Sequence, residues 1–266
     1  MQTLLKDFKS VSLDETNRLA KMLSRAENKY VVNFKQYSAL LAAIREDYAV
    51  LDIDGRNEFQ YASCYYDDNF ACYNEHHQSR RHRFKVRTRK YVNSGLMFFE
   101  VKLKGLRGRT DKHRMGCDSF VMPEIEGEHL RMLNELHSKN YRKEMHFDLT
   151  PSLIVNYSRC TLVALNGGER VTIDFDLGFK LPEGESDAVQ IGHNFIIIET
   201  KSADGRGKAD SALKKMGIRK ASKCSKYCIG VNLTGEGHKN NNFLHTVKRA
   251  RNNIVPVCSA AMEAAQ

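Results

Sequence analysis

The sequence predicts an α+β protein whose centre is an eight-stranded, largely antiparallel β-barrel with flanking helices. Segments in which apolar residues alternate with polar or charged ones recur along the chain, as they do in half-buried strands. Hairpin-length connections join several of these segments, which favours antiparallel pairing. Charged residues occupy one face of most segments, and a barrel accounts for this because its alternate side chains point into one shared lumen.

The helical patterns lie mostly between the strand segments. Ser12 followed by Glu15 forms a capping-box pattern before LDETNRLAKMLSR, and apolar residues recur at helical spacing in NFKQYSALLAAIREDY and EIEGEHLRMLNELHSKNY. Two shorter helices are expected at DSALKKMG, closed by Gly217, and at FLHTVKRAR. We expect these helices to flank the sheet rather than to form the site.

The clearest strand patterns are RHRFKVRTRKY, MFFEVKLKGL and ERVTIDFDLGF, in which apolar residues alternate with basic or acidic ones. Further strand-like runs are AENKYVVN, YASCYYD, SLIVNYSRCTLVAL, NFIIIETKS and SKYCIGVNL, which together make about eight strands. In NFIIIETKS, Glu199 and Lys201 follow an apolar run that is typical of a buried strand. Charges in that position indicate an interior polar site.

At 266 residues, of which 41% are hydrophobic, the chain can bury a sizeable core. It contains four Pro, and no repeat or low-complexity tract marks a linker, so we expect a single domain over residues 1–266. The seven Cys are an odd number and lack the CxxC spacing of zinc sites. We expect reduced core thiols, with Cys224 and Cys228 as an alternative metal-binding pair.

The net charge favours a polyanionic partner. The chain has 42 Lys+Arg against 32 Asp+Glu, a formal net charge of +10, which suits polyphosphate, a nucleotide, nucleic acid or an acidic membrane surface. Trp is absent and no RNP-like aromatic platform accompanies the basic residues, which argues against nucleic acid. No apolar stretch approaches the roughly 20 residues of a membrane helix and no signal peptide is recognisable, so we expect a cytoplasmic protein.

The charges that share a face are the candidate site. On any single strand such charges are ordinarily a solvated face, but seven segments repeat the pattern, which favours a common lumen. Crowded cations are costly to hold together unless a polyanion neutralises them, and Arg and Lys suit phosphate. The residues concerned are Glu27, Lys29, Lys85, Arg87, Arg89, Glu100, Lys102, Lys104, Arg159, Asp174, Asp176, Glu199, Lys201 and Lys226.

The carboxylates of the lumen are candidate ligands for Mg²⁺ or Mn²⁺, with Glu199 foremost and Glu27 and Glu100 beside it. Basic residues and a metal-binding carboxylate are what phosphoryl transfer requires, because its transition state is stabilised mainly by positioning and charge. Asp174 and Asp176 could either bind metal or orient the Arg residues. His76 and His77 lie beside an expected turn, where a loop role is favoured over phosphate or metal contact.

Eight motifs follow one another in the order found in the vacuolar transporter chaperone (VTC) domain, and together they resemble that domain. It is the polyphosphate polymerase branch of the triphosphate tunnel metalloenzymes. The resemblance runs from about residue 20 to 250. The motifs are R-x-E-x-K-Y (25–30), S-x-Y-Y-D (63–67), R-x-K-V-R-T-R-x-Y (83–91), F-E-V-K-x-K (99–104), Y-S-R-C (157–160), T-I-D-F-D (172–176), I-E-T-K (198–201) and S-K-Y-C (225–228).

The resemblance implies phosphate ligands and a metal ligand. Glu199 is similar to the family's metal-binding glutamate, and Ser225 adds a hydroxyl contact. Lys112 is expected in a hairpin after MFFEVKLKGL, where the alignment with the family could shift by two residues, so Arg114 is an alternative contact there. Lys85, Lys104 and Lys201 are further expected substrate contacts. The phosphate ligands that the resemblance implies are Lys29, Arg87, Arg89, Lys102, Lys112, Arg159 and Lys226.

The implied activity is transfer of the ATP γ-phosphate to a growing polyphosphate chain, dependent on Mn²⁺ or Mg²⁺. Arg25 stands where the hydrolase and cyclase branches carry the first Glu of E-x-E-x-K, which favours the polymerase branch. Two alternatives stay open: a tunnel triphosphatase or polyphosphatase, and a non-catalytic module that binds polyphosphate or inositol pyrophosphate. The compact form resembles stand-alone bacterial proteins, for which a separate membrane protein is a possible partner.

Overall fold

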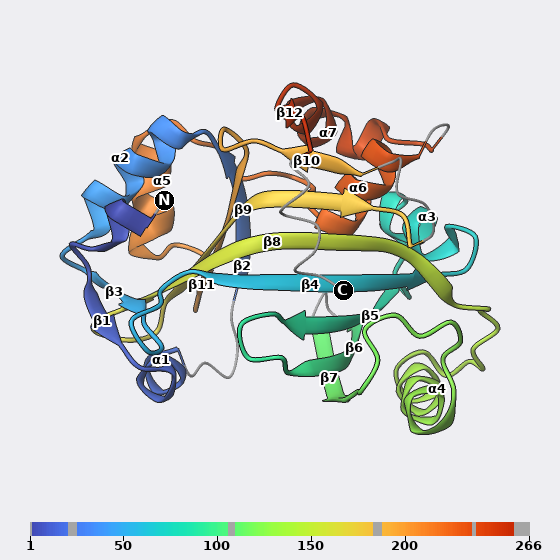
Figure 1. Ribbon diagram of the computed structural model, residues 1–266. Helices are drawn as coiled ribbons and strands as arrows, with labels where there is room; N and C mark the ends of the chain where they lie inside the picture. Colours follow the sequence, from blue (N-terminus) through green and yellow to red (C-terminus); the bar gives the residue numbers. More distant parts are fainter. Residues whose placement is uncertain (1, 21–25, 106–109, 183–187, 236–237, 258–266) are drawn as a thin grey trace.

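A computed structural model describes residues 2–20, 26–105, 110–182, 188–235 and 238–257. The fold is α+β, and its centre is a curled antiparallel half-barrel (Figure 1). Every pairing along the eight-stranded path is antiparallel, as predicted. In order across the sheet, the strands are β2 (Ala26–Val32), β11 (Ile196–Ser202), β9 (Arg170–Lys180), β8 (Thr150–Ala164), β4 (Phe59–Asp67), β5 (Phe84–Tyr91), β6 (Met97–Lys104) and β7 (Thr110–Gly116).

Four short strands extend this path where the long central strands β8 and β9 run past their neighbours. β3 (Tyr48–Leu51) pairs with the end of β8, and β1 (Lys9–Val11) pairs with β3 in parallel. β10 (Val189–Ile191) pairs with the end of β9, and β12 (Ile254–Val255) pairs with β10. Because β8 and β9 each serve more than one neighbour, they form the spine of the sheet, as Figure 1 shows.

One half of the outer face is covered by α2 (Phe34–Ile44) and α5 (Lys208–Lys215), which lie together at one end of the view in Figure 1. Asn33 begins α2 with a complete capping box, and Gly217 follows α5 at φ +71°, where a side chain would be strained. Apolar residues of β2, β8, β9 and β11 pack against both helices. The helical patterns at these two segments are confirmed.

The other half of the outer face packs against α4 (Gly127–Tyr141), beside β5 and β6. The N-terminal elements are a 3₁₀ helix (Gln2–Leu5) and α1 (Leu13–Leu19), which Ser12 caps by accepting a hydrogen bond from the Glu15 N–H at 3.2 Å. Further helices are α3 (Ala71–His77), the 3₁₀ helix η3 (Asn241–Phe243) and α7 (Leu244–Arg251). His76 and His77 thus lie on a helix and not in a loop, which corrects the expectation for them.

The segment SKYCIGVNL, predicted as a strand, is the helix α6 (Lys226–Thr234). α6 lies inside the curl of the sheet, where its side chains pack against β8 and β9. A Cβ at Gly230 would come within 2.5 Å of Leu153 and Phe179 side-chain atoms, so the helix approaches the sheet closely. A helix buried on nearly every side carries no amphipathic period, and the sequence pattern therefore could not identify it.

The strand β7 was not predicted, because the segment was expected to form a hairpin loop. Its sequence, TDKHRMG, is largely exposed and has no apolar face. Charged side chains are usual on an edge strand, where they discourage pairing with other chains. Within the described residues, no helix is long and apolar enough to cross a membrane.

Candidate active site

The register of the half-barrel brings the predicted charges onto its inner face. Lys29 on β2 lies opposite Glu199 on β11, and Lys85 on β5 lies opposite Lys102 on β6. The curl also brings β6 toward β2 across the lumen, so that Lys102 on β6 interacts electrostatically with Glu27 on β2. The inner face carries Glu27, Lys29, Lys85, Arg87, Arg89, Glu100, Lys102, Lys104, Lys112, Arg114, Arg159, Asp174, Glu199 and Lys201, and α6 adds Lys226.

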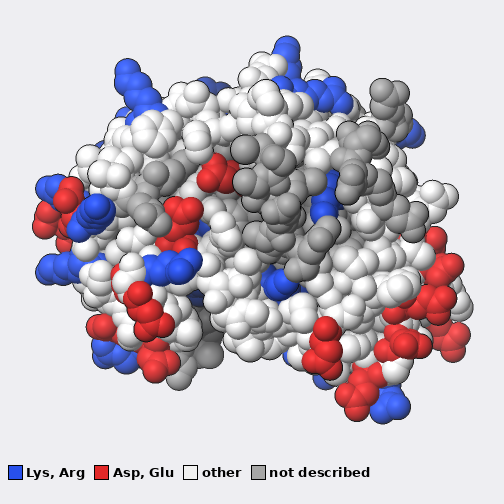
Figure 2. All heavy atoms as spheres, in the orientation of Figure 1, with Lys and Arg blue, Asp and Glu red and all other residues white. Residues whose placement is uncertain are grey.

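Cations outnumber carboxylates on this face, whereas the visible exterior is mixed. Figure 2 shows Lys and Arg interspersed with Asp and Glu around the rim of one face, without a continuous basic patch. The inner face, by contrast, carries eleven Lys or Arg side chains and four carboxylates among the described residues, with Lys226 of α6 counted. Such a lumen focuses positive potential on a narrow ligand, which suits a phosphate chain better than a broad polyanion surface.

Glu100 is the centre of the first charge cluster. Its side chain is 1% exposed, and its Oε2 accepts hydrogen bonds from Arg87 Nε (2.8 Å) and Nη2 (2.6 Å), while Lys112 Nζ donates to Oε1. Arg87 Nη1 donates to the Tyr65 hydroxyl at 2.8 Å. Burial alone would raise the pKa of Glu100, but the charges of Arg87, Arg89 and Lys112 hold it well below its ordinary value.

These contacts fix the Arg87 guanidinium on both sides and leave part of its N–H fork for another acceptor. The contacts of Arg87 and Lys112 also occupy both oxygens of Glu100. Metal binding by Glu100 therefore stays a prediction, and these contacts do not favour it. Tyr65 was not among the predicted site residues. Burial opposes ionisation of Tyr65, yet Arg87, Arg89 and Lys85 lower the pKa of its phenol to about 8. Tyr65 follows Tyr61 and Ser63 at two-residue spacing along β4, and this period could have indicated that its side chain points into the lumen.

Asp174 is the centre of the second cluster. Its side chain is 1% exposed, and Arg159 donates to it through Nε (2.5 Å to Oδ1) and Nη2 (2.8 Å to Oδ2). Lys226, at the first turn of α6, donates to Oδ2. Burial raises the pKa of Asp174, but Arg159 and Lys226 outweigh it and lower the pKa to about 2. These contacts favour the cation-orienting role over the metal-binding role for Asp174, and both roles stay predictions.

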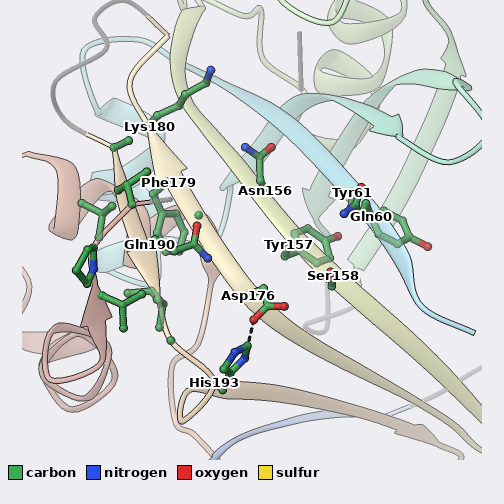
Figure 3. A pocket seen from close by; sticks show the side chains of 18 of the residues that line it. Gln60, Tyr61, Asn156, Tyr157, Ser158, Asp176, Phe179, Lys180, Gln190 and His193 are labelled. Atoms are coloured by element: carbon green, nitrogen blue, oxygen red, sulfur yellow. Dashed lines mark ion pairs between the residues drawn. The ribbon is translucent and has the colours of Figure 1, made fainter. Parts of the chain in front are cut away.

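Asp176 does not join Asp174 on the inner face. Its φ of +52° marks a β-bulge, at which the pairing between β8 and β9 changes register. The bulge turns Asp176 to the outer side, where its Oδ1 lies 3.0 Å from His193 Nδ1 (Figure 3). There it borders a cavity of about 530 Å³ that Gln60, Asn156, Ser158 and Gln190 also line. The alternation of T-I-D-F-D thus predicted the wrong face for Asp176.

Glu27 and Glu199 form the third cluster with Lys29 and Lys201. Lys29 donates to Glu27 and lies 3.0 Å from Glu199 Oε2, and Lys201 pairs with Glu199 Oε1. Burial would raise the pKa of Glu199, but the charges of Lys29 and Lys201 hold it well below its ordinary value. The pKa of Glu27 is also lowered, so Glu27 and Glu199 are both ionised and share these two lysines. Glu27 and Glu199 lie close enough to share these lysines, and carboxylate oxygens suit Mn²⁺ or Mg²⁺, but a metal bound here would have to displace Lys29 or Lys201 from them.

No cluster of three or more acidic, His or Cys side chains suited to a metal occurs in the described parts of the chain. Two carboxylates would thus supply the protein ligands, with phosphate oxygens and water completing the shell, as is usual for Mg²⁺. Cys224 and Cys228 are free thiols, and burial raises the pKa of each. A raised thiol pKa disfavours the thiolate that a metal would need.

Four predicted substrate contacts are Lys85 on β5, Lys112 and Arg114 on β7, and Ser225 at the start of α6. Lys85 Nζ donates to Ser225 Oγ at 2.8 Å, and Ser225 also caps α6, so the two join helix and sheet. Lys112 lies on β7 opposite Lys102, and not in a hairpin loop. Arg114 lies two residues further, with its guanidinium 4.7 Å from the ring centre of Phe98. Arg25 lies outside the described residues.

Two inner-face lysines predict how binding depends on pH. Reduced hydration inside the curl, with Lys29 and Lys85 nearby, lowers the pKa of Lys102 to about 8, although its side chain still reaches solvent. Reduced hydration and Arg87 likewise lower that of Lys112 to about 8. A bound polyanion favours the charged form, so above pH 8 binding requires proton uptake and weakens as pH rises.

We expect tripolyphosphate affinity, measured by calorimetry, to fall by up to about tenfold for each of these two lysines between pH 7 and 9. The matched variant is Lys102→Arg, which keeps its charge over this range and should show a flatter pH profile. Protonation of tripolyphosphate affects binding to both proteins equally, so the difference between their pH profiles reports on Lys102 alone. Parallel profiles for wild type and variant would show that Lys102 does not titrate in the free protein.

A family model described as the VTC domain matches residues 24–234. A candidate adenylate cyclase from Bacillus halodurans is a similar solved structure, with 13% identity, 76% of this chain and 95% of that chain covered, and a TM-score of 0.49. A candidate adenylyl cyclase from Hippeastrum, described as having a dominant triphosphatase activity, is 12% identical over 76% of this chain and 93% of that chain, with a TM-score of 0.46. No curated protein matches. The matched residues run from β2 to α6, which together supply the inner face.

Proposed function

The chain belongs to the VTC domain family, and on that premise we propose that it is a polyphosphate polymerase using ATP as phosphate donor. The observation that carries this proposal is the pairing of the lumen carboxylates. Within the described residues, Glu27, Glu100, Asp174 and Glu199 each contact at least one Lys or Arg. A carboxylate held ionised by cations is a poor general base, whereas an anionic phosphate acceptor needs none.

The inner-face cations would bind and align the two phosphate chains. Arg87 and Arg159 are oriented by Glu100 and Asp174, so their remaining N–H groups are fixed for bidentate contact with phosphate oxygens. Lys29, Lys102 and Lys226 add compact charges around the same lumen. In the described part of the chain the buried Tyr157 hydroxyl has no hydrogen-bond partner, and we propose that it donates to a phosphate oxygen of the bound ligand.

In the proposed reaction, a terminal oxygen of the polyphosphate chain attacks the γ-phosphorus of ATP. A new P–O bond forms, the bond between the γ-phosphorus and the β,γ-bridging oxygen breaks, and ADP leaves with that electron pair. Glu199 and Glu27 would hold Mn²⁺ or Mg²⁺, which would neutralise charge on the donor triphosphate. Lys and Arg stabilise the equatorial oxygens, since this transition state is stabilised chiefly by positioning and charge.

Incubation of the purified protein with ATP and Mn²⁺ or Mg²⁺ tests this function. We expect long, acid-labile phosphate chains on a gel together with ADP, since the proposed reaction transfers the γ-phosphate of ATP to a growing chain. Orthophosphate without chains would identify a triphosphatase instead, and tight binding of ATP without turnover would identify a binding module. Arg87→Ala is the control against a contaminating kinase: chain synthesis that survives this change would not come from the lumen.

A further inference from the structure

A row of aromatic side chains crosses the inner face beside the phosphate-binding cations. This aromatic strip consists of Tyr157, Tyr61, Tyr91 and Phe98, one residue from each of the adjacent strands β8, β4, β5 and β6. Tyr157 and Tyr61 stack with ring centres 5.2 Å apart and planes 5° apart, and Tyr61 and Tyr91 lie 5.1 Å apart. Phe98 meets Tyr91 edge-on at 5.8 Å. The strip is therefore one continuous surface.

Guanidinium groups flank the strip along its length. Arg89 and Arg159 lie 5.5 and 5.3 Å from the ring centre of Tyr61, and Arg114 lies 4.7 Å from that of Phe98. Tyr61, Tyr91 and Phe98 are half-buried, and Arg114 is exposed. By contrast, the outer-face neighbours Ala62 and Phe99 are fully buried. The strip thus keeps part of its ring surface open next to positive charge.

The position of the strip fits one end of a nucleotide. α6 fills the lumen beyond Lys85, where Lys85 contacts Ser225 and Tyr65 stacks on Tyr227 at 5.0 Å. Tyr91 lies at the opposite end of β5, four residues beyond Arg87, which corresponds to about 13 Å along a strand. A triphosphate that enters with its γ-phosphate toward α6 would therefore place its sugar and base toward the strip.

We propose that the aromatic strip is the nucleobase subsite of this tunnel, where the base of a nucleoside triphosphate stacks on Tyr91, Phe98 and the Arg114 guanidinium. The inference rests on the proposed function in taking a nucleoside triphosphate as donor. Stacking needs only a π face and is therefore tolerant of the base's identity. The subsite should accept ATP and GTP alike while favouring both over tripolyphosphate, which has no base.

The test compares the β,γ-imido analogue of ATP with tripolyphosphate by calorimetry in EDTA, where no turnover complicates binding. Phe98→Ala and Tyr91→Ala should each weaken the nucleotide by about tenfold and leave tripolyphosphate within about twofold, since base stacking is worth that much. The matched control is Leu96→Ala in the same hairpin, whose side chain is 57% exposed and not aromatic. It should change neither affinity.

Equal weakening of both ligands would show that the strip only supports the phosphate site, and unchanged affinities in both variants would show that the base lies elsewhere; either result overturns the proposal. The corresponding GTP analogue should bind within about threefold of the ATP analogue, and strong discrimination would contradict recognition by stacking. The test is separate from that of the proposed function. If the protein makes chains but the variants show no selective loss of nucleotide affinity, only the subsite proposal is wrong. If the variants lose nucleotide affinity selectively but the protein makes no chains, only the polymerase proposal is wrong.

Discussion

Glu199→Gln should lower metal-dependent turnover by about a hundredfold or more and should not weaken tripolyphosphate binding in EDTA. Loss of one preorganised electrostatic group at a reacting centre typically has an effect of this size on rate. The same substitution removes a negative charge that pairs with Lys29 at 3.0 Å and with Lys201. Both lysines are then freer to contact phosphate, so metal-free affinity should stay the same or increase.

The opposite signs of these two effects distinguish a metal ligand from a structural residue. Turnover is measured with ATP over a series of Mn²⁺ concentrations, and binding is measured by calorimetry without metal. Asp111→Asn is the matched control, because Asp111 is a half-exposed acid on β7 that pairs with His113 away from the lumen. If the Glu199 variant kept the wild-type rate, the metal assignment would be wrong. Loss of both rate and metal-free binding would indicate a collapsed site.

The alternation of apolar and charged residues predicted most of the half-barrel, because strands with one buried face carry a two-residue period. The same rule could not find β7, whose edge position leaves no apolar face, or α6, which is buried on nearly every side. The pattern of SKYCIGVNL fits a strand as well as it fits a buried helix. Only the curl of the sheet, which encloses this segment, decides between the two.

The charges of the site could be predicted strand by strand, but their partners could not. Which cation meets Glu100 depends on the register of β5, β6 and β7, and a change of one residue would turn every side chain to the other face. The bulge at Asp176 shows this directly, since one residue at positive φ moves a predicted lumen carboxylate to the outer side. The contact between Lys226 and Asp174 likewise requires α6 inside the curl.

Asp174→Asn should destabilise the protein by about 3 to 5 kcal/mol in the absence of phosphate. Asp174 is 1% exposed and neutralises both Arg159 and Lys226, so its loss leaves two cations uncompensated in a poorly hydrated place. The wild-type contribution has a defined pH range. Because its folded pKa is about 2, below the ordinary 3.8, the stabilisation is present above about pH 4 and is lost as pH falls toward 2.

Tripolyphosphate should restore stability to this variant more than it stabilises the wild type, because a bound polyanion supplies the negative charge that Asp174 provided. Urea unfolding with and without saturating tripolyphosphate measures both terms. The matched control is Asp210→Asn, since Asp210 is also buried but accepts hydrogen bonds from Asn28, Tyr30 and Thr200 outside the lumen. That variant should be destabilised without any extra rescue. Equal rescue of both variants would mean that the ligand does not reach Arg159 and Lys226, and the phosphate path through the curl would then have to lie elsewhere.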